Sequence, residues 1–165
     1  MVPVLTTARL TLRGFTEADL DAFAAMQADA EVMRHLGTGQ TRSRAETWQG
    51  MAGFMGQWAL RGHGLWALEH QGRFIGRAGI LNPEGWPAPE LAYALARPAW
   101  GQGLAFEAAE AALRWARAAL PQRRIVSYIR PANGASRRLA ARLGGVQGEA
   151  LELLGAAAEC WDYPQ

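Results

Sequence analysis

The sequence predicts a single α/β domain, covering residues 1–165, in which short strands alternate with amphipathic helices. The length suits one domain of ordinary size, and the composition is 50% hydrophobic and 19% charged, as in a globular chain. Runs with a period of two residues alternate with runs of helical spacing, and no repeat or low-complexity tract divides them. In order, the chain reads as a strand, two helices, three strands, a helix, a strand, a helix and two strands.

The first third of the chain predicts one strand and two helices. Residues 9–13 alternate polar and apolar side chains, as a half-buried strand should. A helix should follow Thr16, a good N-cap, and a second should begin at the capping box of residues 43–46 and run to about Leu60. The second helix carries an apolar stripe that we expect to pack in the core or, in part, to line a substrate cleft: Trp48, Met51, Ala52, Met55 and Trp58.

The middle of the chain predicts three strands. Residues 65–69 and 74–80 are strand-like, and residues 70–73 between them read as a hairpin turn. Residues 82–89 contain three prolines, which cannot serve a central ladder, and therefore predict a loop. The third strand should run from Glu90 to about Ala96.

The last third predicts two helices and three strands. Residues 104–120 form a clear helical pattern, with acids near its start and arginines near its end, where each complements the helix dipole. A strand over 124–129 precedes a helix over 133–144, which ends at a glycine able to adopt the left-handed cap. Residues 146–153 and 158–163 are weaker strand predictions, plausibly antiparallel to each other.

Composition excludes several classes of function. The net charge is only +2 and the arginines are scattered, so nucleic-acid binding is not expected. No signal peptide is visible, and no apolar run approaches the ~20 residues that cross a bilayer. The single cysteine, Cys160, forms no internal disulfide and suits a reducing compartment, so we expect a cytoplasmic protein without membrane association. The histidines lack metal-ligand spacing, and no metal site is expected.

The turn before the long helix is suited to an anionic ligand. The first amides of a helix lack intrahelical partners, and the dipole places partial positive charge there. Gly101 and Gly103 precede the helix and let the backbone approach a ligand closely. A Walker A loop is excluded because the chain has no lysine, and a dinucleotide fingerprint because Phe106 stands where a small residue is needed.

The segment Trp-Gly-Gln-Gly-Leu-Ala (100–105) resembles the pyrophosphate loop of the GNAT acetyltransferase superfamily, whose usual form is Gln/Arg-x-x-Gly-x-Gly/Ala. Residues 133–144 resemble the family's Asn-x-x-Ser/Ala segment and follow the loop by about thirty residues. The sequence of residues 98–107 is most similar to that of the ribosomal-protein N-acetyltransferase (Rim-type) branch. Three departures stand out: Trp100 stands where the family more often has Gln or Arg, Ala140 occupies the position of a common tyrosine, and Gly144-Gly145 stands in place of the family's Gly-Phe ending.

This resemblance implies a mixed, mostly antiparallel central sheet of about six to seven strands flanked by about four helices. It implies transfer of an acetyl group from acetyl-CoA directly to a primary amine, on a protein or peptide N-terminus or on a small molecule, with no metal. The partners would be acetyl-CoA and the acceptor amine, and the protein a monomer or homodimer. A second class stays open, because the missing tyrosine at Ala140 and the substitution at Trp100 also suit a catalytically inactive CoA-binding sensor or interaction module.

The resemblance also assigns the cofactor-binding residues. The turn and helix start would hold the pyrophosphate through Trp100, Gly101, Gln102, Gly103, Leu104 and Ala105. The strand edge at Ala94, Leu95 and Ala96 could pair with the pantetheine amides, as a peptide adds to a sheet edge, and the Leu95 amide could polarise the thioester carbonyl. Asn133 would cap its helix and also touch pantetheine.

Two residues are candidates for proton transfer. Glu90 begins a strand whose same face carries the small residues Ala92 and Ala94, and burial could raise the pKa of its carboxyl toward that of a general base. Alternatively, Glu90 is an ordinary charge in water at a strand entry. Ser136 lies on the inner stripe of its helix and could hydrogen-bond the CoA sulfur, or else bond only to its own backbone.

The loops expected beside the acceptor site suggest which amines fit it. Residues 36–42 and 82–89 contain a single acid, Glu84, which argues against a strongly cationic acceptor such as an aminoglycoside. Trp86 in the second loop is either a wall of the acceptor site or a cover for the sheet.

Overall fold

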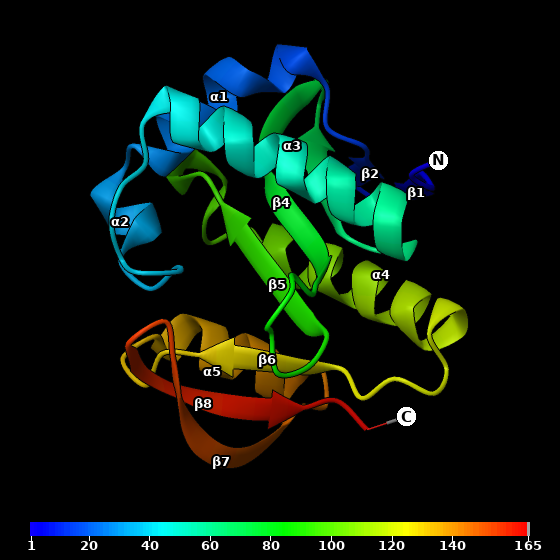
Figure 1. The fold of residues 1–165 in the computed structure, drawn as a ribbon. Coiled ribbons are helices and arrows are strands. Elements are labelled where there is room, and N and C mark those ends of the chain that lie inside the picture. Colours follow the sequence, from blue (N-terminus) through cyan, green and yellow to red (C-terminus); the bar gives the residue numbers. More distant parts are fainter. Residues whose placement is uncertain (165) are drawn as a thin grey trace.

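A computed structural model describes residues 1–164 as a mixed sheet with helices on both faces (Figure 1). The sheet order is β1-β2-β3-β4-β5-β6-β8-β7. The strands are β1 (Leu5–Thr6), β2 (Leu10–Arg13), β3 (Leu65–His70), β4 (Arg73–Leu81), β5 (Glu90–Leu95), β6 (Val126–Ile129), β7 (Val146–Leu153) and β8 (Ala156–Asp162). The helices are α1 (Leu20–Gln27), α2 (Ala30–Met33), α3 (Arg44–Arg61), α4 (Leu104–Ala119) and α5 (Gly134–Arg142).

The predicted fold class is confirmed, with two additional short elements. The described sheet has eight strands because Leu5–Thr6 pairs with β2, a two-residue strand too short to give a sequence pattern. The short helix α2 was not predicted either; it begins at Asp29, whose carboxylate accepts a hydrogen bond from the Glu31 amide. The first predicted helix is preceded by a 3₁₀ turn and begins at Leu20, later than its N-cap motif suggests.

The two faces of the sheet pack against different helices. Helices α1 and α3 cover one face, over a core that includes Phe15, Phe23 and Met51. Helices α4 and α5 cover the other face, where alanines of α4 pack closely over β4 and β5 (Figure 1). Side chains alternate along a strand, so neighbouring residues of β5 serve opposite faces.

The apolar stripe of α3 is only partly a core stripe. Met51 and Trp58 are buried, as core packing predicts. Trp48 is 47% exposed and its indole donates a hydrogen bond to Glu17, and Ala52 is exposed too, so the core interpretation is wrong for these two residues. A different face of α3 lines the cavity described below, and it consists mainly of Gly50, Gly53, Phe54 and Gln57.

The sheet opens between β5 and β6. These strands are parallel, whereas all other pairs in the described sheet are antiparallel. Their register is limited to Glu90 opposite Val126, where the Val126 amide donates to the Pro89 carbonyl at 3.1 Å and the Ser127 hydroxyl donates to the Leu91 carbonyl at 2.6 Å. Beyond these residues β5 and β6 diverge (Figure 1). The edge of β5 that faces β6 is therefore left without a neighbouring strand.

Two kinds of structural feature are absent from residues 1–164. None of the described helices combines the length and the apolar character needed to span a membrane. Within the same residues, no three His, Cys, Asp or Glu side chains are grouped so as to hold a metal ion.

Candidate active site

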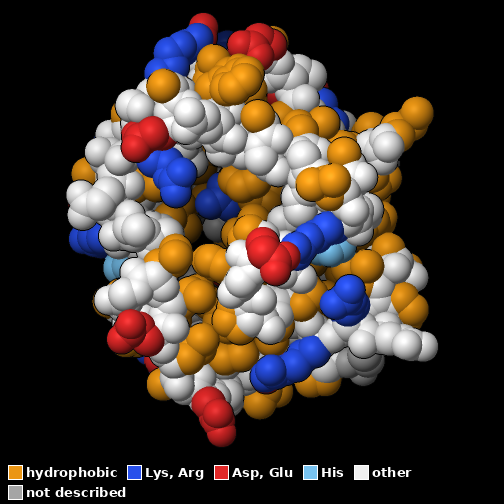
Figure 2. All heavy atoms as spheres, in the orientation of Figure 1, with side chains coloured by type: hydrophobic (Ala, Val, Ile, Leu, Met, Phe, Trp, Pro, Cys, Tyr) orange, Lys and Arg blue, Asp and Glu red, His pale blue; other side chains and the backbone are white. Residues whose placement is uncertain are grey.

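A cavity of about 1370 Å³ lies where the sheet opens. It is lined by residues of α2, α3, β4 and β5 on one side and of β6, α5 and the start of α4 on the other. Figure 2 shows its mouth as a hollow with basic side chains inside it and at its rim. Since pockets for one small ligand usually measure about 300–1,000 Å³, this cavity has room for two substrates.

The glycine turn before α4 lines one end of the cavity, which we call the cofactor end. This turn exposes backbone groups to the cavity rather than side chains. Gly101 and Gly103 have φ angles of 73° and 76°, in the left-handed region that favours glycine. Gly103 is the N-cap of α4 and makes no side-chain capping bond, so the first helix amides remain open to a ligand. Arg9 donates to the Gln102 carbonyl at 2.8 Å and holds the turn in place. This arrangement fits a diphosphate.

Trp100 closes the end of β5. Its indole N–H donates to the Leu95 carbonyl at 2.7 Å, and its side chain is 46% exposed. The Ala96 amide donates to Ile75 on β4 at 2.9 Å, and the Ala94 backbone, two residues earlier, faces β4 as well, opposite Arg77. The expectation that Ala94 and Ala96 offer a free edge to pantetheine is therefore wrong. By strand alternation, Leu95 and Tyr93 are the residues whose backbone N–H groups face the gap. Ala94 contributes its methyl group to the opposite, α3-covered face and lines the cavity there.

Glu90 is buried at the point where β5 and β6 separate. Its side chain is 9% exposed and accepts hydrogen bonds from the Trp86 indole at 2.8 Å and from the Tyr128 amide at 3.4 Å. Burial raises the pKa of Glu90 to about 7, against the opposing effect of these two hydrogen bonds and of nearby arginines. The interpretation of Glu90 as an ordinary exposed charge is therefore wrong. A carboxyl with this pKa can accept a proton near neutral pH.

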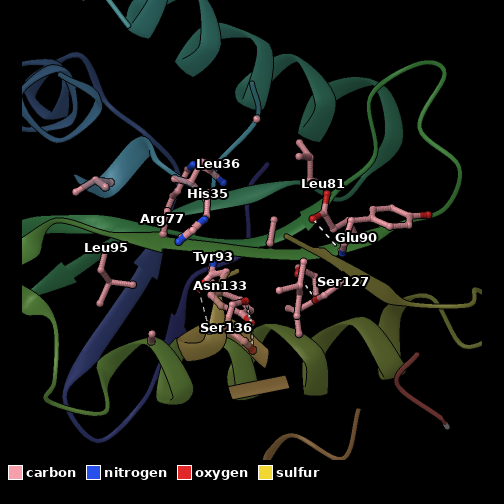
Figure 3. A pocket seen from close by; sticks show the side chains of 18 of the residues that line it. His35, Leu36, Arg77, Leu81, Glu90, Tyr93, Leu95, Ser127, Asn133 and Ser136 are labelled. Carbon is pink, nitrogen blue, oxygen red and sulfur yellow. Dashed lines mark hydrogen bonds between the residues drawn. The ribbon is translucent and has the colours of Figure 1, made fainter. Parts of the chain in front are cut away.

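Asn133 and Ser136 lie at the start of α5, where Ser136 contacts Tyr93 of β5. The Asn133 carbonyl oxygen accepts from the Ser136 amide at 3.2 Å, so the predicted N-cap is confirmed. The Ser136 hydroxyl lies 2.8 Å from the Tyr93 hydroxyl, and either oxygen can be the donor. The alternative that Ser136 bonds only to its own backbone is therefore wrong. Figure 3 shows Tyr93, Asn133 and Ser136 together below the strands, with Glu90 above them.

Three residues of the cavity were missed or left open by the sequence. Tyr93 was overlooked because it alternates with Ala92 and Ala94 onto the opposite face of β5. The sequence left Trp86 as either a wall of the acceptor site or a cover for the sheet. Its hydrogen bond to Glu90 shows that Trp86 borders the cavity. Arg77 was read only as part of a strand. The signal available was its charge within an otherwise uncharged run from Phe74 to Leu81.

Comparison with known proteins identifies the family. Residues 9–146 match a family model described as an acetyltransferase (GNAT) domain. The chain therefore belongs to the GNAT acetyltransferase family.

Individual relatives agree with this assignment. The chain is 30% identical over 147 residues to the protein YkkB of Bacillus subtilis (strain 168), covering 85% of this chain and 83% of that protein. An acetyltransferase from Agrobacterium tumefaciens str. C58 is 31% identical, with a TM-score of 0.89 over 100% of this chain and 96% of that one. RimL, a ribosomal L7/L12 alpha-N-protein acetyltransferase solved with CoA, has a TM-score of 0.82 at 20% identity, over 98% and 97% of the two chains. The RimL likeness shows the shared fold.

Proposed function

We propose that this GNAT-family protein transfers the acetyl group of acetyl-CoA directly to a primary amine, with Glu90 as the general base. The observation that carries the proposal is the position of Glu90: a buried carboxyl of raised pKa, at the mouth of the gap, beside an unpaired strand edge. An amine bound in the cavity would have a proton acceptor within the protein rather than in bulk water.

The chain's own residues would hold acetyl-CoA in the gap. The open amides at Gly101 to Ala105 would bind its diphosphate at the start of α4. The backbone edge at Tyr93 and Leu95 would pair with the pantetheine arm, and the Leu95 N–H would polarise the thioester carbonyl. When bound, acetyl-CoA supplies an activated acyl group whose leaving group is a thiolate.

The chemistry then requires two proton transfers. The amine nitrogen forms the new N–C bond at the thioester carbonyl carbon, the C–S bond breaks, and Glu90 accepts the proton that the nitrogen loses. Ser136 would donate a hydrogen bond to the departing thiolate. Tyr93 would orient that hydroxyl or supply the proton itself, since burial keeps it protonated by raising its pKa to about 12. Tyr93 would thus take the place of the tyrosine that Ala140 replaces.

The acceptor is proposed at the level of a primary amine. The sequence of the glycine turn favours the Rim-type branch. The structural neighbour RimL is described as a ribosomal L7/L12 alpha-N-protein acetyltransferase. A peptide N-terminus and a small-molecule amine are both consistent with a cavity of this size.

The competing function is a CoA-binding module without catalysis. Ala140 and Trp100 favour it, because each replaces a residue that many active relatives carry. The two functions are separated by incubating the protein with acetyl-CoA and a panel of amines while free thiol is measured. Amine-dependent thiol release is the expected result. Tight CoA binding with no thiol release for any amine would instead support the module.

A further inference from the structure

Arg77 is a charged side chain in the cavity that makes no salt bridge within residues 1–164, and Glu90 attracts it only through the longer-range interaction of opposite charges. It lies on β4, and its Nε and Nη1 atoms are buried without a hydrogen-bond partner in the described part of the chain, residues 1–164. Its guanidinium lies over the ring of Phe54, 5.5 Å from the ring centroid. Burial lowers the pKa of Arg77 to about 10, which leaves it charged at neutral pH. Buried N–H donors are normally paired, so two unpaired ones beside a binding cavity point to a ligand.

Arg77 and Glu90 project from the same face of the sheet. In the β4–β5 register Arg77 lies opposite Ala94, and Leu81 lies opposite Glu90. The two side chains therefore start four residues apart along the strands, a separation of roughly 13 Å between backbones. Gly79 and Ala92 pair between them and form a low floor. Figure 3 shows Arg77 and Glu90 on one side of the strands, with Ser136 and Asn133 on the other.

Arg77 therefore lies on the side of the sheet where the proposed acceptor would bind. The thioester would lie in the gap between β5 and β6, on the side of Tyr93 and Ser136. The charges around this part of the cavity are unbalanced. Glu31 is 3.7 Å from Arg34, and the carboxylate of Glu84 is 2.5 Å from Arg61, so both acids at the rim are already paired. Two charged groups of the cavity act on Arg77: Glu90 attracts it, and Arg42 repels it.

We infer that the acceptor amine carries a carboxylate, which Arg77 binds while the amine lies at Glu90. The inference rests on the proposed function and adds a substrate class to it. A guanidinium suits a carboxylate because its planar fork can bind both oxygens. Because Gly79 and Ala92 separate Arg77 from Glu90, the carboxylate of the acceptor would lie several bonds from its amine. Such a compound is either a free amino acid with a distant carboxylate or a peptide with an acidic side chain near its N-terminus.

The test compares matched acceptors that differ only in this charge. Thiol release is measured with ω-amino acids of graded length, each beside its primary amide, and with the peptides Ser-Glu-Ala and Ser-Gln-Ala. For at least one pair, the wild type should show kcat/KM about tenfold higher for the carboxylate, since a charged hydrogen bond of this kind contributes about 1.5 kcal/mol. The amino-acid and peptide arms show which source is used.

The variant Arg77→Met should remove this preference while leaving KM for acetyl-CoA unchanged. Arg77→Lys keeps the positive charge but lacks the planar fork of the guanidinium, and it should retain part of the preference for the carboxylate acceptor. Arg114→Met, on the exposed surface of α4, is the matched control and should behave as wild type. Arg77→Met should fold with an undiminished Tm, because an apolar side chain has no counterpart to the two buried N–H groups of Arg77 that lack partners.

Failure of the inference differs from failure of the proposed function. Equal turnover of carboxylates and amides by the wild type, or a preference that survives Arg77→Met, would overturn the role of Arg77 but leave the acetyltransferase intact. If no amine is turned over, the proposed function fails. Calorimetric titration of the CoA complex with the same amino acids then decides the binding role: equal affinity of wild type and Arg77→Met for every carboxylate would overturn it.

Discussion

The two ends of the cavity are built by different means. The cofactor end consists of one continuous segment, in which two left-handed glycines lead into an uncapped helix and backbone amides provide the binding groups. The acceptor end, formed by Glu90, Trp86 and Arg77, consists of side chains from separate elements and loops that meet only in the folded chain. Backbone recognition tolerates varied side chains, whereas a side-chain site depends on the residue at each position. The first end therefore suits a ligand common to a family, and the second an acceptor particular to one member.

The largest expected effect is at the acceptor end. Glu90→Gln should lower kcat about 100-fold, because a positioned general base typically contributes 10²–10⁴-fold. The wild-type rate should rise with pH through about 7, since only the deprotonated carboxylate accepts a proton, and the variant should lose that rise. Glu84→Gln is the matched control, because Glu84 lies in the preceding loop and is 95% exposed. Equal pH–rate profiles for wild type and Glu90→Gln would exclude Glu90 as the base.

At the cofactor end, a backbone change should act on CoA alone. Gly101→Ala places a side chain at a φ of 73°, at a cost of about 1–2 kcal/mol in conformational strain. We expect CoA affinity, measured by calorimetry, to fall about tenfold as the turn shifts. Gly155→Ala controls for strain, because Gly155 has a φ of 76° in the β7–β8 turn and equally open surroundings. Both variants should lose similar stability; if they also bind CoA equally, the turn at Gly101 is not the anchor.

The residues between the two ends should have an intermediate effect. Ser136→Ala and Tyr93→Phe each remove one hydroxyl of the 2.8 Å pair, and each should lower kcat about fivefold if the pair stabilises the thiolate. The double variant should lose little more than either single one, because the hydroxyls act as a unit. Additive losses would mean that the two hydroxyls act independently, and an unchanged kcat in Ser136→Ala with a loss in Tyr93→Phe would assign the thiolate to Tyr93 alone. Single-turnover measurement of thiol release follows the step directly.

How much could be predicted from sequence follows the same division. The glycine turn, the start of α4 and the Asn133 cap were predictable because each depends on neighbouring residues. The order of strands and helices was predictable for the same reason, apart from the very short elements β1 and α2.

The acceptor end was predictable only in part. Glu90 could be placed at a strand entry, but its burial depends on a loop that folds Trp86 back over it. The Tyr93–Ser136 contact joins residues 43 positions apart, and the isolation of Arg77 depends on which acids are paired elsewhere. These features depend on how distant segments are brought together, and a local pattern carries no information about that.

The smallest expected effect tests how the acceptor end is tuned. Trp86→Phe removes the indole hydrogen bond that stabilises the Glu90 carboxylate, so the pKa of Glu90 should rise. A hydrogen bond of about 1 kcal/mol corresponds to a rise of roughly 0.7 pH units. Because the active form is deprotonated, the rising limb of the pH–rate profile should move to higher pH.

At pH 7 the Trp86→Phe variant should therefore be about threefold slower than wild type. At a pH well above the pKa of Glu90, the two proteins should have equal rates. That recovery distinguishes a tuned base from a damaged site, because a misplaced Glu90 would slow the reaction at every pH. A limb displaced to lower pH would mean that Trp86 acts mainly by excluding water from Glu90. In that case the raised pKa would be a property of the loop as a cover, and the side-chain hydrogen bond would be secondary.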